Sequence, residues 1–371
     1  SVILSAADTL AALQRLARSW REALGATVIG ITGSTGKTST KDLLLALLAP
    51  HRRTVASRAN FNTEIGLPLE ILSAPAQTEV LVLEMAMRGA GQIAELARIA
   101  RPQVGVIVSI GPVHLELLGS VEAIAAAKAE LIAELPPGGQ AIIPAGERLL
   151  AGHLREDVEI VTFGEGGDVR LRAATGRHLE IEAQDQLVAL EVSFDQPHLQ
   201  RNLLAAVAAA RSCGVTPDGH VELALSPGRG QRRALAGGVM LIDDCYNANP
   251  MSMRAALEDL ALTAEREQRA RRVAVLGDML ELGPSELELH AQLADQLRSS
   301  RVDLLVTVGP RARSIAADFP GESRSVADAG EAAGLVPRLL RPGDLVLVKG
   351  SRAVGLELVC RALEAANGDG G

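Results

Sequence analysis

The chain has 371 residues, of which 47% are hydrophobic and 2% aromatic, and its formal net charge at pH 7 is -8. This composition is enough for two or three packed domains and excludes a largely disordered chain. An acidic chain with so few aromatic residues offers neither a basic surface nor stacking platforms, so we expect no nucleic-acid partner.

The three cysteines, Cys213, Cys245 and Cys360, are odd in number and widely separated, without a CxxC spacing. They indicate neither a disulfide framework nor a structural zinc site, and a reducing compartment fits them. No apolar run reaches the roughly 18 residues of a membrane span, and the opening residues lack the organisation of a signal peptide. We therefore expect a soluble cytoplasmic protein without membrane insertion.

The first predicted element is a helix. Apolar residues at helical spacing predict an amphipathic helix over residues 7–24, capped by Asp8 or Thr9 and ended by Gly25. The apolar run ATVIGIT then predicts a short strand that runs directly into the glycine-rich turn GSTGKT. The pattern STKDLLLALLAP predicts a helix after this turn.

Further buried strands follow. Apolar runs at residues 79–85 and 104–110 predict two strands, and GQIAELARIARP between them has helical periodicity. This alternation predicts a parallel sheet covered by helices on both faces. From about Gly139 to Phe194 short β-like segments predict a smaller β-rich elaboration of the same domain, before the helical run NLLAAVAAARSCG.

A second α/β domain is predicted beyond the Pro/Gly/Arg-rich stretch at residues 226–233, which we interpret as a hinge. Four buried-strand candidates alternate with helices there: GVMLIDD, RRVAVLGDM, VDLLVTVG and DLVLVKGS. The fold class is therefore α/β. We expect a linker helix at residues 1–24, a central P-loop-type ATPase domain with a parallel sheet at 25–228, and a Rossmann-like C-terminal domain at 229–371.

The strongest local motif is TGSTGKTS at residues 32–39. In a glycine-rich loop between strand and helix, backbone N–H groups converge on phosphate oxygens and the helix N-terminus favours negative charge. Lys37 would reach the β- and γ-phosphates of a nucleotide, and the Thr38 hydroxyl would bind Mg²⁺. The generic loop has a glycine where this chain has Ile31, so the match is to the shorter pattern TGxxGKT; the alternative is a structural turn. The expected nucleotide contacts are Gly33, Ser34, Thr35, Gly36, Lys37, Thr38 and Ser39.

Two polar residues lie just past predicted strands, where open parallel sheets place their ligands. These are Glu84 and His114, which could hold divalent cations near the phosphates. Taken alone, Glu84 is more often a solvated strand cap and His114 a satisfied polar residue; their common position relative to the loop favours the metal site. Lys128, in an alanine-rich helix, would ordinarily be a solvated cation.

Seven segments together resemble the Mur ligase superfamily, in family order over nearly the whole chain. They are TGSTGKTS, NFNTEIGLPL, VLEMAMRGAGQI, HLELLGSVEAIAAAKAEL, LIDDCYNANP, VLGDMLELG and VKGSRAVGLE. LIDDCYNANP and VLGDMLELG are most similar to the members that add D-alanyl-D-alanine. The resemblance implies that ATP phosphorylates the carboxylate of UDP-N-acetylmuramoyl-tripeptide, and that the amine of D-alanyl-D-alanine attacks this acyl phosphate. The reaction belongs to peptidoglycan synthesis and so to cell shape and division.

The resemblance also implies roles for the residues near the phosphates. Lys37 contacts the transferring phosphate, Thr38 and Glu84 hold one Mg²⁺, and His114 helps to hold a second. Lys128 matches a position that is carbamylated in the family. This modification converts the ammonium into a carboxylate-like group that can lie beside Mg²⁺; an unmodified cation would weaken the metal site.

The substrate side is assigned in the same way. Asn202 matches an adenine-side asparagine, Arg229 a phosphate-side arginine and Asp244 an acidic residue near the nucleotide. Asn60 and Asn62 would face the muramyl tripeptide. The remaining substrate candidates are Tyr246, Asn247, Asn249, Asp278, Met279 and Glu281, the last three in the dipeptide pocket. Without the resemblance, NANP could be a simple turn, Tyr246 a packing residue and GDMLELG an ordinary connection.

Two expectations concern the whole protein. The family carries an N-terminal domain that binds the uridine diphosphate end of the precursor, and this chain starts at the helix that leads out of it. We expect that domain to be missing and substrate binding to be weaker. The alternatives are another Mur-type or folylpolyglutamate-type ligase, and a non-catalytic ATP-binding module, against which Glu84, His114 and Lys128 argue. We expect a monomer.

Overall fold

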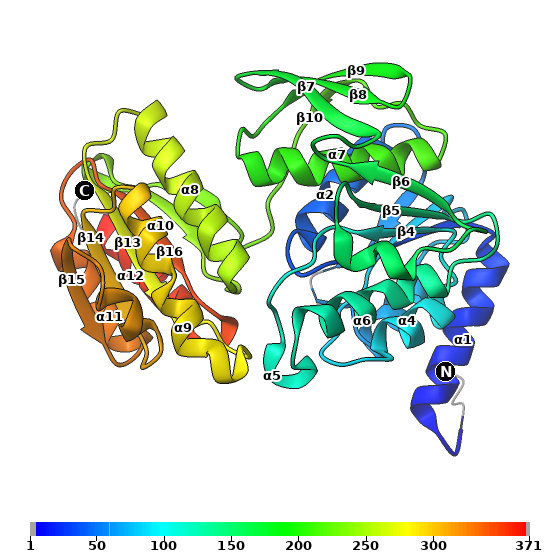
Figure 1. Ribbon diagram of the computed structural model, residues 1–371, viewed down its shortest axis with the longest axis horizontal. Helices are drawn as coiled ribbons and strands as arrows, with labels where there is room; N and C mark the ends of the chain where they lie inside the picture. Colours follow the sequence, from blue (N-terminus) through cyan, green and yellow to red (C-terminus); the bar gives the residue numbers. More distant parts are fainter. Residues whose placement is uncertain (1–4, 59, 369–371) are drawn as a thin grey trace. The chain divides into compact units, whose positions relative to one another are not determined.

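The computed structural model describes residues 5–58 and 60–368, and these form two compact units (Figure 1). The first unit comprises Ser1–Gly111 and Ser120–Ala224, and the second comprises Pro112–Gly119 and Leu225–Gly371. Each unit has its own sheet, covered by helices. No helix among the described residues is both long and apolar enough to cross a membrane.

The predicted first helix is confirmed as α1 (Thr9–Leu24). Of the two predicted caps, Asp8 is the one used, because its side chain accepts a hydrogen bond of 2.9 Å from the main-chain N–H of Ala11. Gly25 ends the helix with φ at 62°, a conformation that glycine adopts without the strain of a side chain.

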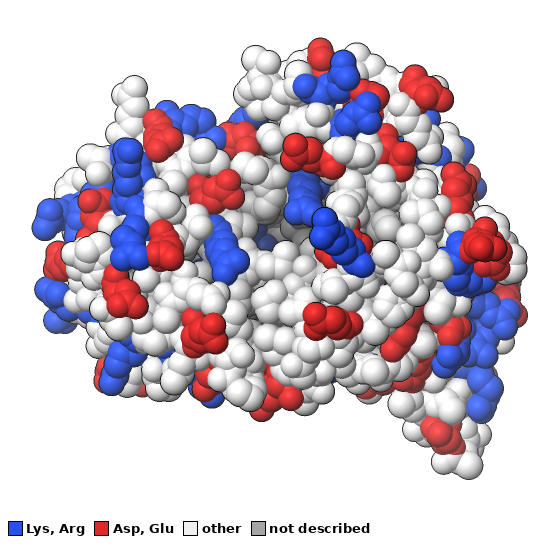
Figure 2. Space-filling model, in the orientation of Figure 1, with Lys and Arg blue, Asp and Glu red and all other residues white. Residues whose placement is uncertain are grey.

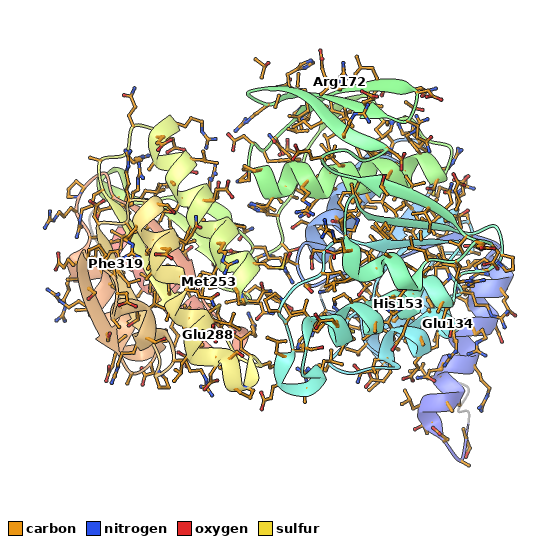
Figure 3. The ribbon with its side chains drawn as sticks, in the orientation of Figure 1. Glu134, His153, Arg172, Met253, Glu288 and Phe319 are labelled. Carbon is orange, nitrogen blue, oxygen red and sulfur yellow. The ribbon has the colours of Figure 1, made fainter. Side chains whose placement is uncertain are left out.

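A ten-stranded sheet organises the first unit, in the order β10-β9-β8-β7-β6-β5-β4-β1-β3-β2. Its parallel strands are β1 (Thr27–Thr32), β2 (Thr54–Ala56), β3 (Val80–Glu84), β4 (Val104–Ile107), β5 (Gln140–Pro144) and β6 (Glu159–Phe163). An antiparallel meander follows, formed by β7 (Val169–Thr175), β8 (His178–Ala183) and β9 (Gln186–Val192), with β10 (Gly219–Val221) parallel to β9. The predicted β-rich elaboration thus extends the same sheet, and exposed Arg172 projects from it (Figure 3).

Helices cover both faces of this sheet, as the alternation predicts. One face carries α2 (Lys37–Leu48) and α7 (Pro197–Ser212); the other carries α4 (Gln92–Ala100) and α6 (Val121–Ala133), with α1 and α3 (Gly66–Ser73) beside them. The side chains of β1, β3 and β4 are almost all buried, as expected of parallel strands between two helical layers. A short helix, η1 (Arg148–His153), packs on α6.

The second unit is a three-layer α/β structure with strand order β11-β12-β16-β13-β14-β15. Its strands are β11 (Gln231–Ala234), antiparallel to its neighbour, and the parallel β12 (Met240–Asp244), β13 (Arg272–Gly277), β14 (Leu304–Val308), β15 (Glu322–Val326) and β16 (Leu345–Lys349). One face packs against α8 (Pro250–Arg266), α9 (Glu286–Ala291) and α10 (Leu293–Ser299) in a core that includes Met253 and Phe319 (Figure 3). The other face packs against α11 (Ala329–Leu339) and α12 (Glu357–Gly368). Shorter helices of this unit are α5 (Leu115–Leu118), η2 (Ala236–Gly238), η3 (Gly283–Ser285), η4 (Ala312–Ala316) and η5 (Arg352–Val354).

The four predicted strands of this unit are confirmed as β12, β13, β14 and β16. Two further strands were not predicted, because β15 is polar and β11 begins inside the stretch interpreted as a hinge. On the face drawn in Figure 2, Lys and Arg side chains are interspersed with Asp and Glu, so that face offers no continuous basic surface.

Candidate functional site

The glycine-rich loop connects β1 to α2 in the first unit. Gly36 is the N-cap of α2 with φ at 81°, and a side chain there would lie 2.6 Å from Oδ1 of Asn202 on α7. Glycine is therefore required by both the backbone conformation and the approach of Asn202. The first turn of α2 directs main-chain N–H groups toward the loop, and it contains Lys37, Thr38 and half-buried Ser39.

The segment after β4 holds this loop in place. The N–H of Ser34 donates to the carbonyl oxygen of Ser109 at 2.9 Å, and the N–H of Thr35 donates to Oγ of Ser109 at 2.9 Å. The Ser34 hydroxyl donates to the carbonyl oxygen of Gly111 at 3.0 Å. Lys37 lies across the loop, with Nζ 2.7 Å from the carbonyl oxygen of Gly33. Ser109 is a loop-positioning residue that the sequence did not reveal.

A buried carboxylate lies beside the loop at the end of β3. Glu84 is 3% exposed; its Oε2 accepts a hydrogen bond of 2.8 Å from the Thr38 hydroxyl, and its Oε1 accepts one of 2.9 Å from Nδ2 of Asn62. Its main-chain N–H donates to Oγ of Ser57 at 3.0 Å. Within residues 5–58 and 60–368 no Lys, Arg or His forms an ion pair with Glu84. A buried carboxylate next to a hydroxyl is a donor set that fits a hard divalent cation such as Mg²⁺.

Lys128 lies on α6 and is 2% exposed. No hydrogen bond or ion pair joins its Nζ to any residue that the structure describes. Burial, and then the nearby charge of Lys37, hold the pKa of Lys128 well below its usual value. A lone lysine in such a helix is expected to be a solvated cation. Lys128 is instead a buried amine that favours its neutral form.

Asn60 and His114 are the remaining candidates from the segments around this site. Asn60 is exposed, and its carbonyl oxygen accepts a hydrogen bond of 2.8 Å from the N–H of Asn62. His114 belongs to the segment that clusters with the second unit, where its Nδ1 pairs with Oε2 of Glu281. His114 and Glu281 both have positive φ, 54° and 62°, which non-glycine residues rarely adopt. The sequence assigned these two residues to different sites and did not predict their pairing.

In the second unit, a buried lysine organises the segment after β12. Lys349, at the end of β16, is 2% exposed; its Nζ lies 2.6 Å from Oδ2 of Asp244 and donates to the carbonyl oxygen of Asn247 at 2.9 Å. Asp244 and Lys349 are also partners in the strand register. Lys349 stands in the segment VKGSRAVGLE, but nothing in the sequence pattern marks it as a site residue.

Tyr246, in the same segment, lies under two guanidinium groups. Cζ of Arg229 is 4.2 Å and Cζ of Arg352 5.3 Å from the centre of the ring, both within the range of a cation–π contact. The structure thus joins Tyr246 to one predicted residue, Arg229, and to one that was not predicted. Asn249 caps α8 through a capping box with Ser252, so its side chain has a structural task at this position.

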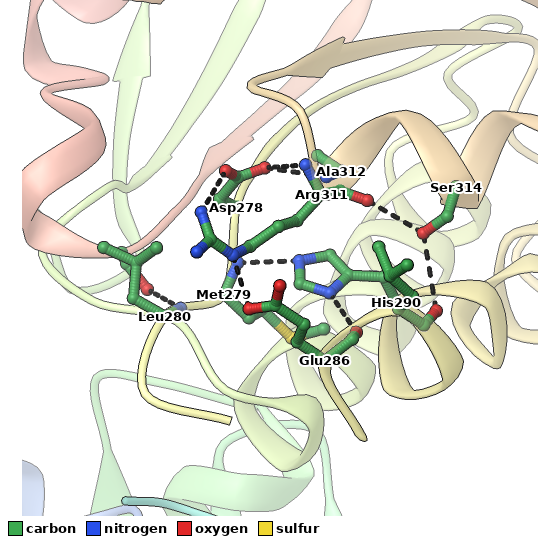
Figure 4. A network of polar contacts seen from close by, with 10 residues as sticks. Asp278, Met279, Leu280, Glu286, His290, Arg311, Ala312 and Ser314 are labelled. Carbon is green, nitrogen blue, oxygen red and sulfur yellow. Dashed lines mark hydrogen bonds and ion pairs between the residues drawn. The ribbon is translucent and has the colours of Figure 1, made fainter. Parts of the chain in front are cut away.

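The segment after β13 is fixed by a polar network (Figure 4). Asp278 is 4% exposed, and its Oδ1 accepts hydrogen bonds from the N–H groups of Arg311, at 3.0 Å, and Ala312, at 2.7 Å. The N–H of buried Met279 donates to Nε2 of His290 at 2.8 Å, and Nδ1 of His290 donates to the carbonyl oxygen of Glu286 at 2.5 Å. Burial lowers the pKa of His290, which agrees with its acceptor role. The Asp278 carboxylate and Met279 are thus turned into the unit.

Two groups of predicted residues come together in the structure. The first unit brings together the loop, Asn62, Glu84, Asn202 and Lys128. The second unit places Arg229, Asp244, Tyr246 and Asn247 together after β12.

Two sequence families match the chain in the same order as these units. The Mur ligase middle domain matches residues 31–210, and the Mur ligase, glutamate ligase domain matches residues 228–352. The chain is 37% identical over 369 residues to UDP-N-acetylmuramoyl-tripeptide--D-alanyl-D-alanine ligase of Synechocystis sp., covering 97% of this chain and 79% of that relative.

Solved structures agree. MurF from Acinetobacter baumannii superposes with a TM-score of 0.88 at 30% identity, over 98% of this chain and 82% of that one. MurF ligase from Thermotoga maritima, in complex with ADP, superposes with a TM-score of 0.86 at 31% identity, over 100% of this chain and 88% of that one. The resemblance on which the sequence analysis relied is confirmed, and the chain belongs to the Mur ligase family.

Proposed function

We propose that the chain is an ATP-dependent ligase that joins D-alanyl-D-alanine to UDP-N-acetylmuramoyl-tripeptide in peptidoglycan precursor synthesis. Curated relatives at 32–38% identity carry this name, and a structural neighbour contains ADP. The reaction forms an acyl phosphate on the tripeptide carboxylate, with release of ADP. The dipeptide amine then forms the amide bond and releases phosphate. We further propose that the protein acts as a monomer in the cytoplasm, where ATP is supplied.

The phosphate loop performs the binding step of this reaction. The N–H groups of the loop and of the first turn of α2 converge on the phosphates, and the glycines let the backbone approach them. Lys37 moves its ammonium from the carbonyl oxygen of Gly33 to the transferring phosphate. Because this chemistry needs alignment and charge neutralisation rather than a protein nucleophile, these contacts supply most of the catalysis.

Thr38 and Glu84 would hold Mg²⁺, which when bound supplies neutralisation of the phosphoryl charge. Asn62 and Ser57 fix the two ends of Glu84, one at the carboxylate and one at the main-chain N–H. The carboxylate therefore keeps one orientation, and Asn62 acts here as a positioning residue. His114 is proposed to contribute to a second metal site.

Lys128 is proposed to carry a carbamate. Its neutral amine adds to carbon dioxide, forming an N–C bond and releasing one proton, which converts the side chain into an anion. The burial of Lys128 and the lowered pKa of its amine favour this reaction, since only the neutral amine is a nucleophile. The product would place a negative group near the charge of Lys37.

The other residues act on the substrates. We propose that Asn202 contacts the adenine side of the nucleotide, that Arg229 contacts its phosphates, and that Asp244 lies near it from the domain at residues 229–371. Asn60 would face the tripeptide. Tyr246, Asn247 and Asn249 are proposed to contact substrate. The dipeptide pocket is proposed to lie at the segment of Asp278, Met279 and Glu281, in which the side chain of Glu281 is the most accessible.

The observation that carries the proposal is the buried carboxylate of Glu84, held against the Thr38 hydroxyl beside a phosphate loop. A test is ATP-dependent phosphate release by the purified chain with Mg²⁺, UDP-N-acetylmuramoyl-tripeptide and D-alanyl-D-alanine, with each component omitted in turn. Release that needs all components, with the pentapeptide product found by mass spectrometry, is expected. Release with a single amino acid or a folate acceptor instead would assign another ligase, and nucleotide binding without release would assign a binding module.

A further inference from the structure

Three side chains of types that bind metals meet inside the second unit. They are Asp243 at the end of β12, Cys245 directly after it, and Cys360 on α12. Their ligand atoms all lie within 4.8 Å of one another, and each residue is at most 4% exposed. Among the residues that the structure describes, this is the one group of three or more His, Cys, Asp or Glu side chains with such spacing.

The carboxylate of this cluster is already oriented. Arg233 on β11 donates to Oδ2 of Asp243 at 3.1 Å and also pairs with Glu364 on α12. Oδ1 of Asp243 accepts a long contact of 3.4 Å from the N–H of Cys245, and the Cys360 thiol also hydrogen-bonds to this carboxylate. In metal sites, a second residue that holds one carboxylate oxygen commonly orients the other toward the ion.

The charges and donor types of this cluster select the ion. Two thiolates and one carboxylate carry three negative charges, and a divalent cation offsets two of them; Arg233, which is shared between Asp243 and Glu364, offsets part of the remainder. Paired cysteine sulfurs favour Zn²⁺ over hard cations such as Mg²⁺ or Ca²⁺. We infer that Asp243, Cys245 and Cys360 form a binding site for a thiophilic divalent cation such as Zn²⁺.

A redox or nucleophilic role explains the cluster less well. Cys245 and Cys360 are each 3% exposed, whereas reactive cysteines need an accessible thiolate. Three protein ligands leave the fourth position of a tetrahedral ion to a water molecule. The sequence did not indicate the site, because Cys245 and Cys360 are 115 positions apart and become neighbours only when α12 packs on the sheet.

The ion would join the segment after β12 to α12. Cys245 lies between Asp244, which Lys349 holds, and Tyr246, which lies under Arg229 and Arg352. A filled site would therefore restrain the start of this segment in addition to the contacts of Lys349. This inference concerns metal binding alone and does not depend on ligase activity.

The test uses the reduced, metal-free full chain, titrated with Co²⁺ in the presence of excess Mg²⁺ to occupy oxygen sites. We expect a sulfur-to-cobalt charge-transfer band that saturates at one ion per chain and is removed by one equivalent of Zn²⁺. Folded wild-type protein without this band at saturating Co²⁺ would overturn the inference. Because this readout needs no variant and no substrate, its failure is separate from a failure of the ligase assay.

Variants then assign the ligands. Cys360→Ala and Cys245→Ser should each abolish the band, and Asp243→Asn should weaken it; far-ultraviolet circular dichroism checks that each variant folds. Arg233→Gln should lower the affinity roughly 10–100-fold, as the loss of a residue that orients a ligand does. Cys213→Ser is the matched control, since Cys213 lies in the first unit, and should leave the band unchanged. A band that survives in the Cys245→Ser/Cys360→Ala double variant would also contradict the site.

Discussion

The ion pair between Asp244 and Lys349 predicts an unequal effect of removing either partner. Lys349 is 2% exposed, whereas the Asp244 side chain is 21% exposed, and Nζ and Oδ2 are 2.6 Å apart. Asp244→Asn leaves a buried ammonium without its counter-charge. Lys349→Met instead leaves a carboxylate that water can reach. Asp244→Asn should therefore destabilise the second unit more than Lys349→Met does.

The magnitudes follow from this burial. Breaking a buried pair costs about 3–5 kcal/mol when the remaining charge is enclosed. For Asp244→Asn the upper limit is about 4.6 kcal/mol, the cost of removing a proton from an ordinary lysine in water at pH 7. Lys349→Met leaves the carbonyl oxygen of Asn247 without its donor and exposes Asp244 to water, which together cost about 1–3 kcal/mol. The double variant should cost about 1–3 kcal/mol less than the sum of the single changes.

Hydrogen exchange of the amides in β12 and β16 measures this difference within the second unit, because core amides exchange through its cooperative opening. Arg324→Gln is the control, since the pair of Arg324 with Glu322 is exposed and contributes at most about 1 kcal/mol. Equal effects of the two single changes, or effects that add in the double variant, would refute the argument from burial.

Three further predictions concern the two units. Gly36→Ala should abolish ATP cleavage and lower the free energy of unfolding by about 1–3 kcal/mol, because the new side chain would meet Asn202 at 2.6 Å. Gly91→Ala is the control: Gly91 also has positive φ but no neighbour within 4 Å, so this variant should keep ATP cleavage. Equal activities of the two variants would contradict the prediction. Lys128→Ala should lower the rate of ligation roughly 10–100-fold. With ¹³C-bicarbonate, nuclear magnetic resonance should detect a carbamate signal in the wild type but not in this variant. The same signal in the variant would disprove the assignment to Lys128. The pKa of His290 is lowered in the folded protein, so its contribution to stability is complete above about pH 6.5 and is lost as the pH falls from there toward the folded pKa, by at most about 1.36 kcal/mol per pH unit. His290→Gln should remove this pH dependence of the unfolding free energy, as measured by thermal unfolding at several pH values. An unchanged pH dependence would exclude His290 as its source.

Much of the fold could be predicted from the sequence, because apolar runs and helical periodicity report burial directly. The central strands β1 and β3 are examples, since their residues are apolar and nearly all buried. β15 could not be found in this way. Its sequence ESRSV is polar, and only pairing with β14 makes it a strand.

The part of the site that is contiguous in sequence could be predicted, and the part that depends on tertiary contacts could not. The loop at residues 32–39 is contiguous, so its glycines and Lys37 can be recognised locally. Two other contacts of the site could not be recognised locally. Asn62 and Glu84 are 22 positions apart, and Tyr246 and Arg352 become neighbours only through the order of strands in the sheet. Asn249 differs from these residues, because it lies in a recognisable motif but its side chain caps a helix.

The edges of both sheets bear on how this chain avoids aggregation. The ten-stranded sheet ends in β10 and β2, which have three residues each. The six-stranded sheet ends in β11, with the sequence QRRA, and in β15, with ESRSV. Short or charged edge strands resist pairing with strands of other molecules, whereas the long apolar strands lie inside both sheets. Edge strands of this kind therefore limit pairing between copies of the chain, although the interior of both sheets consists of strand sequences that, once exposed, would associate readily.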